Sequence, residues 1–494
     1  MNYLDTLVLV MPEAILAIAA LAVLAVDLMV MRQKPEEKRF QAGAAIAILG
    51  CLAAAAWLFG IARPGDVSGM ILNDSLTRLV KLAVLALTVC AILISLGGRF
   101  TRHIGEYLAL ILMAAIGMLL LVCATDLLMI FIALELTSLS LYILAGFNKS
   151  DINSAEAALK YFLFGGVSAA FTLFGLSLVY GFTGSTNLKE IASHLVTAAT
   201  PDRLLIVALV MTVIGFGFKV AAAPFHWWAP DAYQGAPVPS AVLISSASKV
   251  AGFFVFARVL MVGFAGADGS GAWRQFAAGW APALAILAAT SMILGNLAAI
   301  AQSNVKRLLA YSAIAHAGYA LLGLLSNTGA GLGSLIYYTI TYGITVAGAF
   351  GVVMVVERAT GGATLANFAG FGKREPLLAF CMMIFMLSLA GIPPLAGFFG
   401  KFYLFTAAAA GAKPLGLLWL VFLAVAMSAV SLYYYLQVLK RIYVAPVPDG
   451  PTPLPSPLSS RLLLCALALA VVLLGCLPDL LVKPVLASMQ NFGF

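Results

Sequence analysis

Four charged side chains lie in the middle of stretches apolar enough to cross a bilayer: Glu135, Lys219, Lys249 and Lys401. In hydrocarbon a charged side chain costs at least about 2.5–3.5 kcal/mol, so it persists where it is paired, hydrated or used. Snorkelling cannot relieve this cost, because a lysine stem reaches roughly 6 Å and the interface lies about 15 Å from the middle of the core. These residue types at this depth indicate a path for protons or ions.

Glu135 and Lys219 are candidates for a coupled pair. A carboxyl group in hydrocarbon favours its neutral form, whereas a nearby ammonium group favours the carboxylate, so the two would exchange protons as a unit. Lys219 lies five residues before Pro224, where a helix would be interrupted. The alternative is a structural ion pair, which stabilises little because both charges must be desolvated.

Lys249 and Lys401 have polar surroundings of their own. Lys249 ends a serine-rich segment, and Ser245, four residues earlier, would lie on the same helix face and could hold a water molecule. Lys401 follows Pro393 and Pro394, which should leave two preceding backbone carbonyls, those of residues 389 and 390, without helical partners.

His316 is a candidate relay between Lys249 and Lys401, because an imidazole titrates near neutral pH. A lone histidine in a membrane is equally often a hydrogen-bond donor between helices, so both alternatives stay open. Hydroxyl groups that could line a water wire beside it belong to Tyr337, Tyr338, Thr339, Thr341 and Tyr342. The segment of His226, Trp227 and Trp228 is expected in the interfacial aromatic belt. Glu13 and Asp126 lie closer to span ends and are less informative, and Lys160 is compatible with an ordinary anchor.

Composition assigns the chain to the polytopic helical membrane proteins. Of its 494 residues, 63% are hydrophobic and 10% are charged, with a mean hydropathy of +1.05, whereas soluble proteins carry about 25% charged residues. The net charge of +8 comes from basic residues in short loops, which is typical of membrane topology rather than nucleic-acid binding. The sequence has no CxxC pair, phosphate-binding glycine loop or metal-ligand spacing, so we expect no cofactor or metal in this chain.

Fourteen apolar windows of about 20 residues predict an all-α protein with about fourteen transmembrane helices. They cover 6–30, 41–61, 79–97, 108–124, 127–146, 161–183, 203–232, 240–262, 280–300, 305–325, 332–357, 377–410, 415–439 and 461–485. The first window lacks the basic start and small-residue cleavage site of a signal peptide, so it is interpreted as a retained span. Because the windows are continuous rather than alternating, a closed barrel is excluded.

Two windows contain internal breaks, at Pro224 in the seventh and at Pro393-Pro394 in the twelfth. Interrupted spans in corresponding positions are typical of inverted repeats with a site at the breaks. The sequence therefore predicts two five-helix inverted repeats, spans 4–8 and 9–13. The predicted units are 1–107 (helices 1–3), 108–263 (first repeat), 280–443 (second repeat) and 444–494 (a proline-rich linker and helix 14).

Loop charges predict the orientation. With an outward N-terminus, sixteen lysines and arginines fall on inward loops and seven on outward loops, so both termini are expected outside.

Several motifs resemble the antiporter-like membrane subunits of respiratory complex I, the NADH–quinone oxidoreductase. They are GFKVAAAPFHWWAPDAYQGAPVPSAVLISSAS followed by Lys249, SAEAALKYF from Ser154, LAGIPPLAGFFGKFYLF at 389–405 and SLYYYLQVLKRIY at 431–443. The resemblance covers nearly the whole chain. The N-terminal MPEAILAIAALAVLAVDL, fourteen spans and no C-terminal lateral helix favour one branch, and Lys401 separates it from a sister subunit with glutamate there.

The resemblance implies proton-transfer roles for Glu135, Lys219, Lys249 and Lys401. It also implies proton input from the cytoplasm, a central hydrophilic axis and output to the periplasm, in a multi-pass protein of the bacterial inner membrane. The partners would be the other membrane subunits and, indirectly, the redox arm. NADH, flavin (FMN), Fe–S clusters and the quinone would belong to those other subunits, so this chain would be a translocase subunit without redox chemistry.

Two alternatives remain open. One is a subunit of a multisubunit cation/proton antiporter, in which similar motifs exchange Na⁺ for H⁺. The other is a structural subunit that holds its neighbours while pumping occurs elsewhere.

Overall fold

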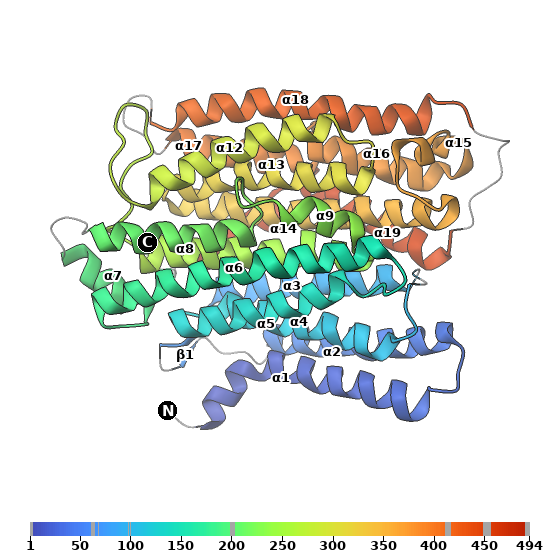
Figure 1. Cartoon of the computed structure of the whole chain (residues 1–494), viewed down its shortest axis with the longest axis horizontal. Helices are drawn as coiled ribbons and strands as arrows, with labels where there is room; N and C mark the ends of the chain where they lie inside the picture. The colour runs from blue at the N-terminus through green and yellow to red at the C-terminus, as the bar shows by residue number, and fades with distance from the viewer. Residues whose placement is uncertain are drawn as a thin grey trace.

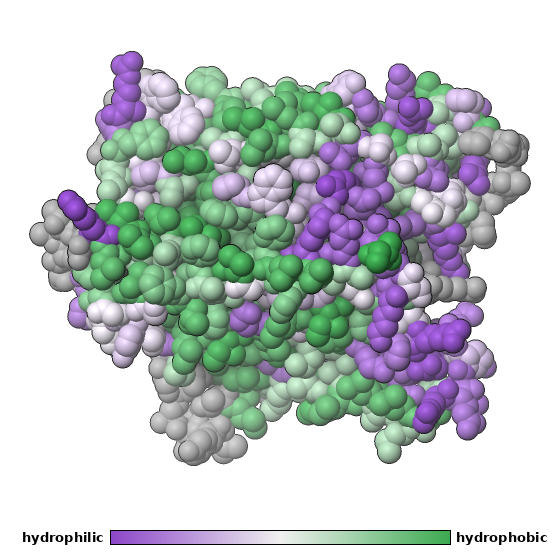
Figure 2. All heavy atoms as spheres, in the orientation of Figure 1, coloured by the Kyte–Doolittle hydropathy of each residue, from purple (hydrophilic) through white to green (hydrophobic). Residues whose placement is uncertain are grey.

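The computed structural model describes residues 3–60, 65–67, 69–96, 98, 100–197, 203–410, 416–447 and 456–489. Long helices run side by side across the molecule and form one bundle (Figure 1). Figure 2 shows apolar side chains over the middle of this face, while polar side chains gather at one end. An apolar flank with polar residues at one end is the arrangement expected of helices surrounded by lipid.

Within its described residues, the first half of the chain forms eleven α-helices and one small hairpin. They are α1 (Tyr3–Ala25), which continues as a π-helical turn η1 (Val26–Val30), α2 (Glu36–Gly60), α3 (Ser75–Ser95), α4 (Ile104–Cys123), α5 (Leu127–Ala145), α6 (Ile152–Thr183), α7 (Leu188–Thr197), α8 (Arg203–Lys219), α9 (Trp228–Gly235), α10 (Val238–Ser245) and α11 (Ala247–Arg258), with a second π-helical turn η2 (Val259–Gly263). Between α2 and α3 lie antiparallel strands β1 (Gly65–Val67) and β2 (Ile71–Asn73), with Asp66 opposite Leu72.

The second half also consists of long helices, with one predicted span divided into the two shorter helices α16 and α17. It contains α12 (Trp280–Ile300), α13 (Val305–Leu325), α14 (Gly329–Thr360), the 3₁₀ turn η3 (Leu365–Phe368), α15 (Phe371–Arg374), α16 (Pro376–Ala390), α17 (Ala396–Ala410), α18 (Leu418–Tyr443), α19 (Leu458–Cys476) and α20 (Asp479–Met489).

Short polar side chains fix where many helices begin. Asp74, Asp126, Asp151, Asn304 and Thr328 each precede a helix and accept a hydrogen bond from a backbone N–H of its first turn. Such caps satisfy amide groups that have no partner within the helix.

The predicted all-α polytopic fold is confirmed. Among the described residues, twelve helices are long and apolar enough to cross a membrane. The seventh and twelfth predicted windows are each divided into shorter pieces, so the total of fourteen spans stays a prediction.

Both predicted breaks are present. One break follows its lysine along the chain, and the other precedes its lysine. Helix α8 ends at Lys219 itself, before Pro224 is reached, and α9 starts at Trp228. Helix α16 ends at Ala390 and α17 starts at Ala396, so Lys401 lies inside the second piece.

A third interruption was not predicted. The window 240–262 is divided at Ser246, whose backbone (φ −113°, ψ −86°) is not helical. The Ser245 and Ser246 hydroxyls both donate to the Val242 carbonyl, at 3.2 and 2.6 Å, and such side-chain bonds compete with the helical ladder. The expectation that Ser245 and Lys249 share one helix is therefore wrong.

The predicted proline-rich linker falls largely on residues 448–455, which lie outside the described residues.

Candidate functional site

Glu135 lies half-buried on α5, and Lys219 lies almost fully buried at the end of α8, with 6% of its surface exposed. The structural ion pair that was the alternative for these two residues is not formed within 4.0 Å. Instead, the Lys219 Nζ donates to the Ser138 Oγ at 3.3 Å. Because Ser138 follows Glu135 by three residues, both side chains share one face of α5. The two charges thus influence each other across a hydroxyl-lined gap rather than through a contact.

The break after Lys219 is held by neighbouring helices. On α12, Ser291 accepts the Ala223 N–H at 2.8 Å and Thr290 donates to the Ala223 carbonyl at 2.9 Å. The Trp228 indole donates to the Phe218 carbonyl at 3.1 Å. These bonds satisfy backbone groups that the interrupted helix leaves free, as the interior of a membrane protein requires.

Lys249 is 3% exposed and its Nζ donates to the Ala313 carbonyl on α13 at 2.7 Å. It also lies over the ring of Tyr342, 5.8 Å from the centroid. In the described part of the chain it forms no ion pair with an acid. A lone lysine in this position is held by a carbonyl dipole and an aromatic face, both weaker partners than a carboxylate.

His316 lies on α13, one turn beyond Ala313, and bridges two phenols. Its Nδ1 is 2.6 Å from the Tyr338 hydroxyl and its Nε2 is 3.1 Å from the Tyr435 hydroxyl. The Tyr435 hydroxyl also lies 2.5 Å from the Ser312 Oγ. Either ring nitrogen of His316 can carry the proton. The hydrogen-bonded series of Tyr338, His316, Tyr435 and Ser312 can therefore be oriented with its donors pointing towards either end. Of the predicted hydroxyls, Tyr338 contacts His316 directly and the Tyr342 ring packs 4.9 Å from it.

Lys401 is 4% exposed and has three acceptors. Its Nζ donates to the Leu389 and Ala390 carbonyls, each at 3.0 Å, and to the Ser428 Oγ at 2.8 Å. The two carbonyls are those expected to be freed by Pro393-Pro394, so this prediction is confirmed. Lys401 also lies 5.0 Å from the ring centroid of Tyr319.

Helix α13 connects the second half of this row. Ala313, His316 and Tyr319 are spaced by three residues, which places them along one face of the helix, and they contact Lys249, two tyrosines and Lys401 respectively. Among the described residues, no hydrogen bond or ring contact joins Lys219 to Lys249 in this way. The stem of Lys219 packs against α11, the helix of Lys249, since a Cβ on Gly252 would lie 3.3 Å from the Lys219 Cγ.

The structure shows buried charges that the sequence interpretation underrated. Glu13 on α1 and Lys81 on α3 form an ion pair of 2.6 Å, with 4% and 1% of their side chains exposed. Arg258 is 1% exposed, and donates to the Val122 carbonyl at 2.5 Å and the Thr77 hydroxyl at 2.9 Å. Their only sequence signal is the presence of a charge inside an apolar window, because no local pattern shows which distant residue is the partner.

Lys160 is more than an interfacial anchor. It contacts Glu156 at 2.6 Å and Asp231 at 2.8 Å, and Asp231 also accepts from Arg307 at 2.5 Å. Asp231 therefore joins α6 of the first half to α13 of the second. A cavity of about 220 Å³ opens beside this network.

In the segment expected in the aromatic belt, Trp227 is 66% exposed, whereas His226 and Trp228 are buried inside the bundle. Trp228 stacks on Tyr161 with ring centroids 4.1 Å apart. The depth of this segment in a membrane stays a prediction. Asp126 caps α5 and accepts the Thr186 hydroxyl. No group of three or more His, Cys, Asp or Glu is arranged to hold a metal ion in the part of the chain that the structure describes.

A helical bundle with two spans broken next to prolines, a third interrupted at Ser246 and a row of buried lysines defines an antiporter-like membrane protein. Residues 124–428 match the family described as "NADH:quinone oxidoreductase/Mrp antiporter, TM". The chain is 50% identical to "NADH-quinone oxidoreductase subunit N 2" of Acidobacterium capsulatum, over 98% of this chain and 99% of that protein. It is 40% identical to "NADH-quinone oxidoreductase subunit N" of Trichlorobacter lovleyi, over 88% and 87%. The chain belongs to the subunit N family of NADH–quinone oxidoreductases.

Solved structures agree. A chain of respiratory complex I from Thermus thermophilus, in a structure with bound aureothin, superposes with a TM-score of 0.76 at 34% identity, covering 96% of this chain and 98% of that one. A chain of the Mrp complex from Dietzia sp. superposes with a TM-score of 0.81 at 20% identity, covering 100% and 98%. The second likeness concerns the fold alone.

Proposed function

We propose that this chain is the proton-translocating subunit N of a bacterial NADH–quinone oxidoreductase, coupled to electron transfer in other subunits. The observation that carries the proposal is the row of Lys249, His316 and Lys401, all buried and joined through one face of α13. Three cationic or titratable groups at this depth are costly to keep unless they are used.

Glu135 and Lys219 form the input end in this proposal. In the described part of the chain, the Lys219 Nζ has one hydrogen-bond acceptor, the Ser138 Oγ. A change in the charge of Glu135 therefore alters the protonation equilibrium of Lys219 without breaking a direct bond. When Glu135 becomes neutral, the ammonium loses its nearest counter-charge and releases its proton more readily. Water molecules would carry the proton to Lys249.

His316 and the Tyr435 hydroxyl form the link between Lys249 and Lys401. A proton accepted at one ring nitrogen can leave from the other, and Tyr338 and Tyr435 hold the ring so that both nitrogens face a hydroxyl. Lys401, with two carbonyls and a hydroxyl around its Nζ, is the group that releases the proton outward.

The surroundings of the chain follow from the same proposal. Its partners are other membrane subunits and, through them, the redox arm with NADH, FMN, Fe–S clusters and quinone. Both termini face the periplasm of a bacterial inner membrane, and residues 108–263 and 280–443 are the two inverted repeats.

The likeness to the Mrp complex keeps cation/proton exchange as a second candidate. Sodium-independent proton uptake driven by NADH would exclude exchange.

The test is proton uptake by membrane vesicles during NADH oxidation. Lys219→Ala and Glu135→Ala should abolish uptake while the complex still assembles, and Lys219→Arg should also fail, because a guanidinium keeps its proton. Lys483→Ala, at a side chain that is 76% exposed on α20, is the control and should pump normally. Full pumping by Lys219→Ala and Glu135→Ala would refute the proposal.

A further inference from the structure

An apolar groove lies on the other side of α14 from His316. It encloses about 730 Å³ between α2, α3, α14 and the segment of α19 and α20. Its walls include Cys51, Ala55, Phe59, Leu79, Leu82, Ala86, Val89, Ile340, Ile344, Leu474 and Leu481, with Ser75, Arg78 and Ser488 as polar members. None of these residues belongs to the lysine row.

The groove is long and polar at one end. On α3 it extends from Ser75 to Val89, which is about 21 Å at 1.5 Å per residue. Half of a bilayer core is about 15 Å thick, so a groove of this length reaches from the headgroup level to the middle of the membrane. Arg78 lies in the first turn of α3, at the end where an interface is expected, and only apolar α3 residues follow it.

The chemistry of the polar end matches a phosphate group. The Arg78 Nη2 already donates to the Ser75 Oγ at 3.2 Å, so guanidinium and hydroxyl are held together. A guanidinium offers several donors in a plane and binds phosphate oxygens strongly.

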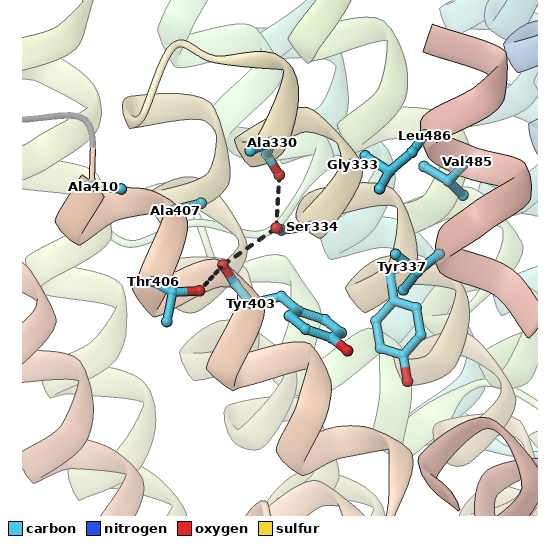
Figure 3. Close-up of a pocket in the computed structure, with 11 residues that line it drawn as sticks. Ala330, Gly333, Ser334, Tyr337, Tyr403, Thr406, Ala407, Ala410, Val485 and Leu486 are labelled. Atoms are coloured by element: carbon cyan, nitrogen blue, oxygen red, sulfur yellow. Dashed lines mark hydrogen bonds between the residues drawn. The ribbon is translucent and has the colours of Figure 1, made fainter. Parts of the chain in front are cut away.

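A second apolar cavity provides a contrast. It encloses about 360 Å³ between α14, α17 and α20, and Figure 3 shows Tyr337 and Tyr403 side by side with Val485 and Leu486 beyond them. Among the described residues, its lining has hydroxyl groups but no charged side chain. The described lining therefore offers no group that would select a charged lipid headgroup.

We propose that the groove between α2, α3, α14 and α20 binds one acyl chain of an anionic phospholipid, whose phosphate contacts Arg78 and Ser75. The bound chain packs against Ile340 and Ile344 of α14. Tyr338 and Tyr342 each lie two residues from Ile340 along α14, so they project from the side of the helix opposite the groove. On that side both tyrosines face His316. The lipid thus supports the helix that positions His316. The binding site itself does not depend on the proposed proton path.

Photocrosslinking of the purified complex tests the proposal. The probe is phosphatidylglycerol with a diazirine in one acyl chain, and labelled peptides are mapped by mass spectrometry. Labels are expected on residues 51–59 and 79–89, with much weaker labelling by the matching phosphatidylcholine probe. Arg78→Gln should reduce the preference for phosphatidylglycerol about tenfold, the value of one charge-assisted hydrogen bond.

A bulky side chain should exclude the lipid. Ala55→Trp and Ala86→Trp, both inside the groove, are expected to remove the labels, and Ala53→Trp, an exposed position on α2 outside the groove, is the matched control. If one groove variant does not assemble, the other decides. Equal labelling by both lipids, or labelling that persists in Ala86→Trp, would mean ordinary surface lipid and overturn the proposal. No labelling in the wild-type complex, as when a neighbouring helix or a quinone tail fills the groove, would also overturn it.

Discussion

The two spans that are broken next to prolines each carry a buried lysine, yet they hold it in different ways. Lys219 is the last residue of α8, before its break, and its Nζ has one hydroxyl acceptor at 3.3 Å. Lys401 lies after its break, and its Nζ takes the two carbonyls that the break frees as well as a hydroxyl. Because moving the Lys401 ammonium would break three hydrogen bonds, its position is fixed largely by the backbone carbonyls of its own span.

The first site depends instead on charges in its surroundings. Its carboxylate is half-buried and not in contact with Lys219, so a modest rearrangement of α5 or a neighbouring subunit changes the interaction. In the proposed function, this difference places the receipt of the signal at the Lys219 end and the outward release of the proton at the more rigidly held Lys401 end.

The largest contrast is expected in stability. Lys401→Met should leave the Leu389 carbonyl without a donor inside the membrane, and the Ala390 carbonyl with only the long bond from the Ser428 Oγ at 3.5 Å. An unsatisfied group of this kind costs about 1–3 kcal/mol. Lys219→Met loses one long hydrogen bond and also removes a desolvated charge, so its free energy of unfolding should change by less than about 1 kcal/mol. Thermal unfolding of the assembled complex measures both. Equal losses of Tm would show that the two sites do not differ.

The glycines beside the two lysines sharpen the comparison. Gly391 has φ +88°, and a Cβ there would lie 3.1 Å from the Lys401 Cδ. Gly391→Ala should therefore destabilise the chain by about 1–3 kcal/mol through backbone strain. Gly252→Ala is the matched control: it lies inside α11, its Cβ would be 3.3 Å from the flexible Lys219 Cγ, and alanine favours the helix by up to about 1 kcal/mol. A neutral Gly391→Ala would contradict the fixed geometry of the second site.

Much of the second site could be predicted from the sequence, because its determinants are local. Pro393-Pro394 removes amide donors, and this identifies the carbonyls that Lys401 then occupies. The interruption at Ser246 could not be predicted, since neither glycine nor proline marks it. The ion pair of Glu13 and Lys81 joins residues 68 positions apart, and the sequence alone does not indicate which distant charge is the partner. For the same reason the sequence could name Glu135 and Lys219 as candidates for a coupled pair but could not give the distance between them.

The link between the halves should be sensitive to a single hydroxyl. Tyr435→Phe removes the partner of the His316 Nε2 and of the Ser312 Oγ, a loss of about 1 kcal/mol or roughly fivefold in proton transfer. Proton uptake per NADH oxidised measures it. Tyr337→Phe is the control, because its hydroxyl donates to the Leu474 carbonyl at 2.7 Å and does not contact His316. If the control lowers uptake as much as Tyr435→Phe, His316 is not part of the path.

The smallest effect is expected where the two halves meet at one end of the bundle. Asp231 is 24% exposed and binds Lys160 of α6 and Arg307 of α13, so Asp231→Asn should cost about 0.5–1 kcal/mol, the range of partly exposed ion pairs. Because salt screens such pairs, 1 M NaCl should lower the Tm of the wild-type complex towards that of the variant, whose own Tm changes little. Asp479→Asn, which removes the exposed pair with Lys483, should leave the Tm unchanged. A Tm of the wild type that ignores salt would show that the halves are held by apolar packing alone, and that Asp231 does not couple them.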